Sequence, residues 1–214
     1  MSGTLSATIS TTPCSPSPRP CGSTTGAVRG NRMSNFDQDD QIRRSPPQQP
    51  YQANSAILYA PKNALEQTVG VLQGAGRVET CCFWYGRDLP GGCGRVEAVV
   101  VPPQRGTWGN YDVTGEAMAA VSAATRAKRW VALAQVHSHP GDWVEHSRYD
   151  DARAISRGVL SVVFPRYGHW TGPWPHRAGI HEFQINYWHL LSIADAARRL
   201  VLEGAGTVSF LDLR

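Results

Sequence analysis

The feature that most constrains this chain is a set of polar residues that directly follows an apolar run near its middle. Residues 130–136 (WVALAQV) are rich in Val, Leu and Ala, and HSHP follows from His137. A short apolar run of this kind indicates a buried strand. Because side chains two apart on a strand point to the same face, His137 and His139 can converge on one ion at its carboxyl end. Pro140 and Gly141 then predict a turn.

A third potential ligand follows on a predicted helix over residues 147–156. Ser147 is typical of a helix N-cap, which puts Asp150 in the first turn. Two imidazoles and one carboxylate suit Zn²⁺, with a fourth position left for water. Each part also has an ordinary explanation: Ser147 and Asp150 fit a capping box, and His137 and His139 could be surface imidazoles. Their combination behind a strand favours a metal site, whereas Asp151 is directed elsewhere on the helix and is expected at the surface.

Charge and cysteine content bear on partners and compartment. Lys and Arg number 21 against 17 Asp and Glu, and because the basic residues are scattered we expect no nucleic-acid partner. Without a long apolar run or a secretory signal, we expect a cytoplasmic protein and no membrane partner. The cysteines lack the spacing of a disulfide framework, and the adjacent Cys81 and Cys82 are expected to be reduced and buried.

The chain divides by composition into a tail and one domain. Residues 1–52 are dominated by Ser, Thr, Pro, Gly, Gln and Asn, which predicts a disordered tail. Met33 offers an alternative start of translation, which the sequence does not decide. Residues 53–214 are long enough for one domain with a sizeable core.

Apolar patterning predicts the other elements of this domain. Helices are expected where apolar residues recur on one helical face, over residues 61–76, 112–129 and 187–203. Strands are expected over residues 78–86, 95–103, 158–165, 178–186 and 208–214. The first two should form a hairpin, and 178–186 should be an edge strand. The loop 166–177, which carries Trp170 and Trp174, is either a lid over substrate or a surface loop anchored by its tryptophans.

Metal-assisted hydrolysis also needs a group that accepts a proton from the bound water. Glu79 is the only carboxylate set in an otherwise apolar predicted core element, the strand at 78–86. A buried carboxylate is costly unless it has a partner or a role. The alternative is that Glu79 lies at the solvent-facing start of an edge strand.

These residues together resemble the JAMM motif of the JAB/MPN metalloproteases, the family of metal-dependent deubiquitinating enzymes and their prokaryotic relatives. Glu79 is followed by CCFWYG, then by HSHP, then by Ser147-x-x-Asp150, and the resemblance covers about residues 57–184. It implies a JAB/MPN-like α/β (α+β) fold, a curved mixed β-sheet flanked by helices. Cys82 stands where prokaryotic relatives commonly have glycine, a departure that affects strand packing more than chemistry.

The resemblance also assigns roles to the motif residues. His137, His139 and Asp150 would be ligands of one Zn²⁺ with a catalytic water. Glu79 would be the general acid and base of a zinc metalloprotease, and Ser147 would stabilise the oxyanion.

The resemblance further implies a substrate class. Members of the family most often cut the peptide or isopeptide bond after the C-terminal glycine of ubiquitin or a ubiquitin-like protein. This chain resembles stand-alone bacterial JAB proteins, which are often encoded with ubiquitin-like, E1-like and E2-like proteins, in several cases within antiviral defence operons. We therefore expect an isopeptidase that matures such a modifier or removes it from targets. The alternatives are a protease that processes a sulfur-carrier protein and a non-catalytic MPN scaffold.

Overall fold

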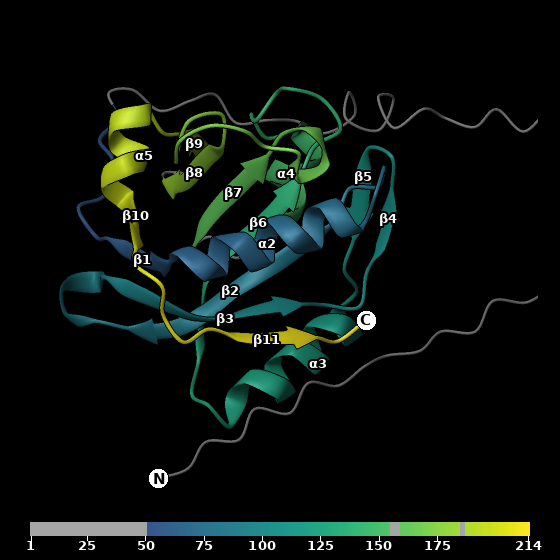
Figure 1. The fold of residues 1–214 in the computed structure, drawn as a ribbon, viewed down its shortest axis with the longest axis horizontal. Coiled ribbons are helices and arrows are strands. Elements are labelled where there is room, and N and C mark those ends of the chain that lie inside the picture. The colour runs from purple at the N-terminus through teal and green to yellow at the C-terminus, as the bar shows by residue number, and fades with distance from the viewer. Residues whose placement is uncertain (1–50, 155–158, 185–186) are drawn as a thin grey trace, which may run out of the picture. The chain divides into compact units, whose positions relative to one another are not determined.

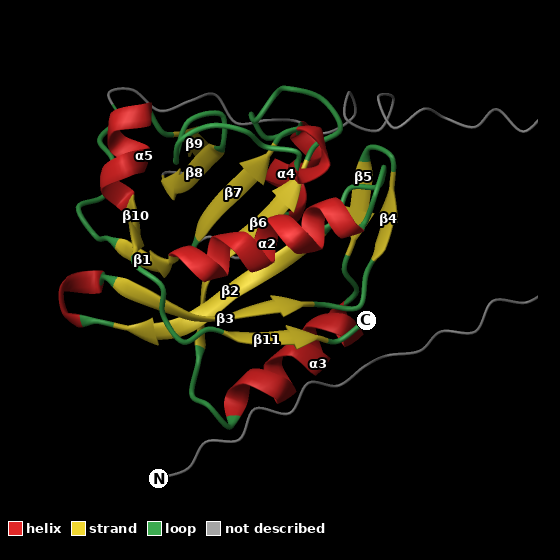
Figure 2. Cartoon of the chain, viewed as in Figure 1, coloured by secondary structure: helices red, strands yellow, loops and turns green. Residues whose placement is uncertain are grey.

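The computed structural model describes residues 51–154, 159–184 and 187–214. The predicted tail lies outside these residues except for its last two positions, and so does the alternative start at Met33. Figures 1 and 2 show a large sheet with helices packed beside it, and the expected mixed α/β class with helices flanking the sheet is confirmed. None of the helices in the described part of the chain is long and apolar enough to cross a membrane.

Within the described residues, nine strands form one mixed sheet. They are β1 (Leu58–Pro61), β2 (Cys81–Asp88), β3 (Gly94–Val101), β6 (Val131–Ser138), β7 (Leu160–Phe164), β8 (Gly179–Gln184), β9 (Tyr187–Leu190), β10 (Leu200–Glu203) and β11 (Ser209–Asp212). The strand order is β10-β1-β3-β2-β6-β7-β8-β9, and β11 pairs with the C-terminal half of β3. The predicted hairpin is confirmed as the antiparallel pair β2 and β3.

The other elements are four helices, two 3₁₀ turns and a small separate hairpin. These elements are α2 (Lys62–Gly74), α3 (Gly115–Arg126), α4 (Arg148–Arg153), α5 (Ile193–Arg199), η1 (Pro90–Gly92), η2 (Arg166–Gly168), β4 (Arg105–Thr107) and β5 (Asn110–Asp112). The sequence did not predict β4 and β5, because three-residue strands are too short to show a period. α3 begins after the N-cap Thr114, whose side chain accepts from the backbone of Ala117, so it is shorter than predicted.

The alternation of side chains along β2 divides the interior into two cores. Cys82 and Trp84 lie in the core that α2 covers, whereas Cys81 and Phe83 lie in the core that α3 covers. Cys81 and Cys82 are both fully buried free thiols, as expected. The central strand β2 is therefore covered on both faces.

The predicted helix over residues 187–203 is wrong. The segment instead forms β9, α5 and β10, and Leu190 and Ile193, expected on a buried helix face, are 41% and 56% exposed. Pairing of β9 with β8 buries Trp188, and pairing of β10 with β1 buries Leu200. Pairing with strands outside the segment thus outweighs a local helical period. The prediction of 178–186 as an edge strand is wrong for the same reason, because β9 covers the outer side of β8.

Candidate metal centre

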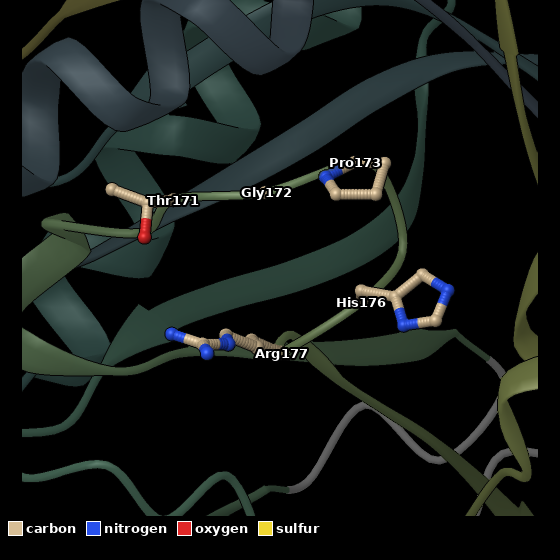
Figure 3. A pocket seen from close by; sticks show the side chains of 5 residues that line it. All are labelled: Thr171, Gly172, Pro173, His176 and Arg177. Atoms are coloured by element: carbon tan, nitrogen blue, oxygen red, sulfur yellow. The ribbon is translucent and has the colours of Figure 1, made fainter.

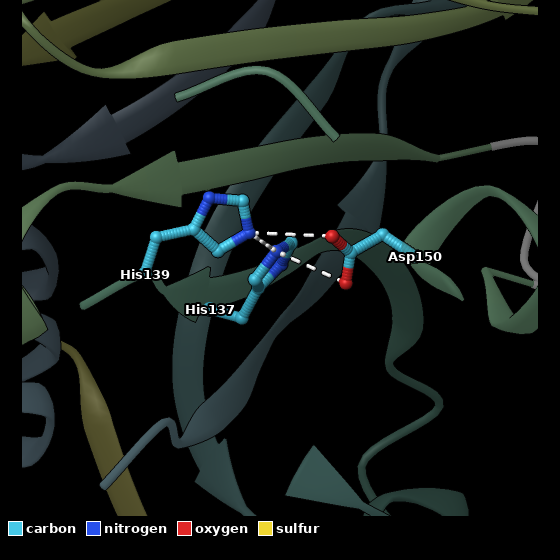
Figure 4. Close-up of side chains that lie close together, drawn as sticks. All are labelled: His137, His139 and Asp150. Atoms are coloured by element: carbon cyan, nitrogen blue, oxygen red, sulfur yellow. Dashed lines mark hydrogen bonds and ion pairs between the residues drawn. The ribbon is translucent and has the colours of Figure 1, made fainter. Parts of the chain in front are cut away.

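The two histidines of the HSHP segment lie at the carboxyl end of the central strand β6. His137 is in the strand and His139 follows it, where its backbone N–H donates to the carbonyl of Phe164 at 2.8 Å. Their Nε2 atoms are 3.1 Å apart, and both rings are buried (Figure 4). The prediction that these imidazoles converge is confirmed.

The third member of the group, Asp150, reaches the same point from the first turn of α4. Its Oδ1 is 3.4 Å from Nε2 of His137, and its Oδ2 is 3.2 Å from Nε2 of His139. Zinc bonds of about 2.0–2.1 Å in tetrahedral geometry would hold ligand atoms about 3.4 Å apart. The observed separations are close to this value, at 3.1 Å between the two imidazoles and 3.4 and 3.2 Å from them to the two different oxygens of Asp150. The buried group His137, His139 and Asp150 can therefore hold a metal ion.

The charge states of the group also suit a cation. Burial alone would raise the pKa of the Asp150 carboxyl, but the imidazoles of His137 and His139 hold it well below its usual range. Burial lowers the pKa of His137, despite the opposing effect of Asp150. At neutral pH the carboxylate is thus ionised and the His137 ring is neutral, which are the forms that bind metals.

Contacts behind the three side chains fix their orientation. Nδ1 of His139 lies 3.3 Å from the carbonyl oxygen of Trp143. Because a carbonyl only accepts, Nδ1 carries the proton and donates, which leaves the Nε2 lone pair directed at the site. In α4, the backbone N–H and the hydroxyl of Ser147 both donate to Oδ2 of Asp150 at 2.8 Å. The capping box is therefore present, and it holds Asp150 in the orientation that a ligand needs.

Glu79 lies just before β2, at the same end of the sheet as the histidines. Cys81 pairs with His137 across β2 and β6, and the N–H of Ser138 continues this pairing to the carbonyl of Thr80 at 3.2 Å. Glu79 directly precedes Thr80 in the chain, and it is 6% exposed. The alternative that it faces solvent is therefore wrong.

The small hairpin of β4 and β5 covers this end of β2. The backbone N–H of Glu79 donates to the carbonyl of Thr107 at 2.7 Å. A Cβ at Gly106 would lie 2.3 Å from the carbonyl oxygen of Glu79, so only glycine permits this close approach. From the same hairpin, the ring of Tyr111 lies 5.3 Å from that of His137. No sequence pattern pointed to Tyr111, because the hairpin that carries it was not predicted.

One further residue beside the centre, Asp151, differs from expectation. Asp151 was expected at the surface, but its side chain is only 16% exposed and its Oδ1 lies 3.0 Å from Nδ1 of His146. The expectation was wrong because the helix pattern alone does not show the contact with His146, the buried loop residue that precedes the N-cap. One signal for this contact was present in the sequence: the lone polar residue of the apolar strand β7, Ser161, which is the second partner of His146.

The loop over residues 166–177 begins beside the candidate centre, where the backbone N–H of Tyr167 donates to the carbonyl of His139 at 2.8 Å, and it continues against α2 and the core. Trp170 and Trp174 are half-buried against that core, and their indole N–H groups donate to the carbonyls of His176 and Leu200. A shallow pocket on the loop is lined by Thr171, Gly172, Pro173, His176 and Arg177 (Figure 3). The half-buried indoles favour the loop anchored by its tryptophans over the lid.

Comparison with known proteins establishes the fold but no family. No family model matches the chain, and no curated protein matches it. The solution structure of a protein from Desulfitobacterium hafniense has a TM-score of 0.56 at 15% identity, over 69% of this chain and 94% of that one. A protein from Salinibacter ruber scores 0.48 at 20% identity, over 63% and 89%, which is too low to support an argument. At such identities the first likeness shows a shared fold alone.

Proposed function

We propose that this chain is a zinc-dependent isopeptidase of the JAB/MPN type that cleaves after the C-terminus of a ubiquitin-like protein. The observation that carries the proposal is the buried group His137, His139 and Asp150, whose spacing fits tetrahedral Zn²⁺. A buried carboxylate, Glu79, at the same end of the sheet adds the base that hydrolysis requires.

Each motif residue has a part in the proposed reaction. A bound Zn²⁺ would lower the pKa of its water and polarise the scissile carbonyl. The Glu79 carboxylate would accept the proton from this water and pass it to the leaving amine. His137, His139 and Asp150 would hold the ion, and the accepting carbonyl of Trp143 would keep Nε2 of His139 unprotonated.

Ser147 can serve the reaction only by changing its hydrogen bond. Its single hydroxyl proton is donated to Oδ2 of Asp150 in this structure. The hydroxyl would have to rotate to donate to the developing oxyanion, where one donor contributes about 3 kcal/mol. The backbone N–H of Ser147 would then remain as the donor to Asp150.

The substrate class follows from the motif resemblance. Ubiquitin-like proteins present their scissile bond in an extended C-terminal tail, a form of peptide that proteins can bind by strand addition at a sheet edge. In this proposal the chain acts in the cytoplasm with E1-like and E2-like partners, within a bacterial antiviral defence operon, and matures the modifier or removes it from targets.

The test is cleavage of the ubiquitin-like protein encoded nearest the gene, carrying a C-terminal extension. Wild type should release the extension directly after the last residue of the modifier, and Glu79→Ala should not, as read by intact mass. A sulfur-carrier protein with the same extension serves as the second substrate. Cleavage of the carrier alone would replace the modifier as substrate, and cleavage of neither by zinc-loaded protein would reject the proposed substrate class.

A further inference from the structure

A second buried polar cluster lies behind the candidate metal centre. His146, the residue before the N-cap of α4, is 6% exposed and bonds on both sides of its ring. Its Nδ1 is 3.0 Å from Oδ1 of Asp151, and its Nε2 is 2.7 Å from the hydroxyl of Ser161. Asp151 belongs to α4 and Ser161 to the central strand β7, so one side chain connects the helix to the sheet.

The chemistry of the partners suits these bonds. An ionised carboxylate only accepts, so Nδ1 of His146 carries a proton and donates to Asp151. The hydroxyl of Ser161 can donate to Nε2 of a neutral ring or accept from Nε2 of a protonated one. Ser161 is fully buried, and a buried hydroxyl without a partner would cost free energy. The contact with His146 gives this hydroxyl a partner.

Ring contacts hold His146 in the same place. Its ring stacks on that of His181 from β8, with centroids 4.0 Å apart and planes 23° apart. Burial keeps the pKa of His181 well below its usual range, so this ring is neutral at neutral pH. On the other side the His146 ring centroid lies 5.8 Å from that of His137. The cluster therefore packs directly against one of the candidate ligands.

We propose that His146 is a positioning residue, which through Asp151 and Ser161 fixes α4 on β7 so that Asp150 meets the two histidines. This inference rests on the proposed metal centre. α4 has only six residues, and a helix of this length is not stable by itself. Asp150 and Asp151 are adjacent in its first turn, so anchoring of Asp151 sets the rotation at which Asp150 faces His137 and His139.

The experiment measures Zn²⁺ affinity of the full chain by competition with a chelator of known affinity. Asp151→Ala and Ser161→Ala each remove one of the two hydrogen bonds of His146, and both should weaken binding on the order of tenfold, the effect of removing a partner that orients a ligand. Asp151→Asn keeps an acceptor oxygen and should bind within about threefold of wild type. Asp142→Ala is the matched control, because it removes a carboxylate that is exposed and paired with Arg166 in the same segment.

The result separates positioning from general damage and from failure of the proposed function. Circular dichroism and the urea midpoint of the metal-free proteins report folding, and Ser161→Ala, the smallest change, should leave both close to wild type. Wild-type affinity in Asp151→Ala and Ser161→Ala would overturn the positioning role while leaving the metal centre intact. Equal loss in Asp142→Ala would overturn it as well. A wild-type chain that binds no Zn²⁺ would reject the metal centre itself, and the positioning role with it.

Discussion

Breaking the buried ion pair between Glu182 and Arg199 should destabilise this fold strongly. Their side chains are 8% and 9% exposed, and Nε of Arg199 lies 2.5 Å from Oε2 of Glu182. The other carboxylate oxygen accepts from the hydroxyl of Tyr51, the backbone N–H of Asn54 and the side chain of Gln184, all within 2.9 Å. The pair therefore ties the segment before β1 to β8 and α5.

The magnitude follows from what remains after one partner is removed. Arg199→Met leaves a buried carboxylate with neutral donors only, and loss of one member of a buried pair costs about 3–5 kcal/mol. That is a large share of the roughly 5–15 kcal/mol by which domains are stable. The double variant Glu182→Gln/Arg199→Met should cost clearly less than the sum of the single changes, because no uncompensated charge stays buried.

Urea unfolding followed by tryptophan fluorescence measures these differences. The matched control is Arg95→Met, which removes the cation of an ion pair with Glu203 whose side chains are 50% and 33% exposed, and which should cost about 0–1 kcal/mol. An Arg199→Met variant no less stable than Arg95→Met would refute the reasoning. So would a double variant whose loss equals the sum of its parts.

The same carboxylate predicts a dependence of stability on pH. Burial would raise the pKa of Glu182, but the donors from Asn54, Arg199 and Tyr51 lower it below its usual value. A group with a depressed folded pKa contributes stability above its unfolded pKa of about 4.3, and this contribution is lost as pH falls through the folded value. The free energy of unfolding should therefore fall below about pH 4.3, and Glu182→Gln should remove this part of the dependence. A Glu182→Gln protein with an unchanged acid limb would contradict the assignment.

Two further predictions concern the thiols and the serine. Burial raises the pKa of Cys82 to about 12, and Cys81 is equally buried. Alkylation of the folded protein at pH 8 should therefore modify the half-buried Cys93 before Cys81 or Cys82. Peptide mass mapping checks this order, and early labelling of Cys82 would contradict the packing of β2. Ser147→Ala should keep Zn²⁺ but lower turnover about 10²-fold if the serine stabilises the oxyanion; an unchanged turnover number would limit Ser147 to its capping role.

The sequence predicted the members of the metal group because the determinants of each position are local. A strand of apolar residues places His137 and His139 on one face, and an N-cap places Asp150 in a first turn. Their convergence also depends on the position of α4 against the sheet, where His146 contacts both Asp151 of α4 and Ser161 of β7. The burial of Glu79 was suggested by its apolar neighbours in the same way.

Features that depend on contacts with other helices or strands were not predicted. β9, α5 and β10 were taken for one helix, since the pairing that separates them comes from β8 and β1. The contact of Asp151 with His146 depends on the position of Ser161 in β7, ten residues further along the chain. Local periodicity carries no information about such contacts.

Zinc content of the purified chain tests the central claim most directly. We predict one Zn²⁺ per chain in wild type and in Glu79→Ala, because Glu79 is not among the proposed ligands, and loss of the metal in His139→Ala, which removes one of the three proposed ligands. Elemental analysis after dialysis gives the three values side by side. Metal-free wild type, or a His139→Ala protein that retains its full zinc, would contradict the account.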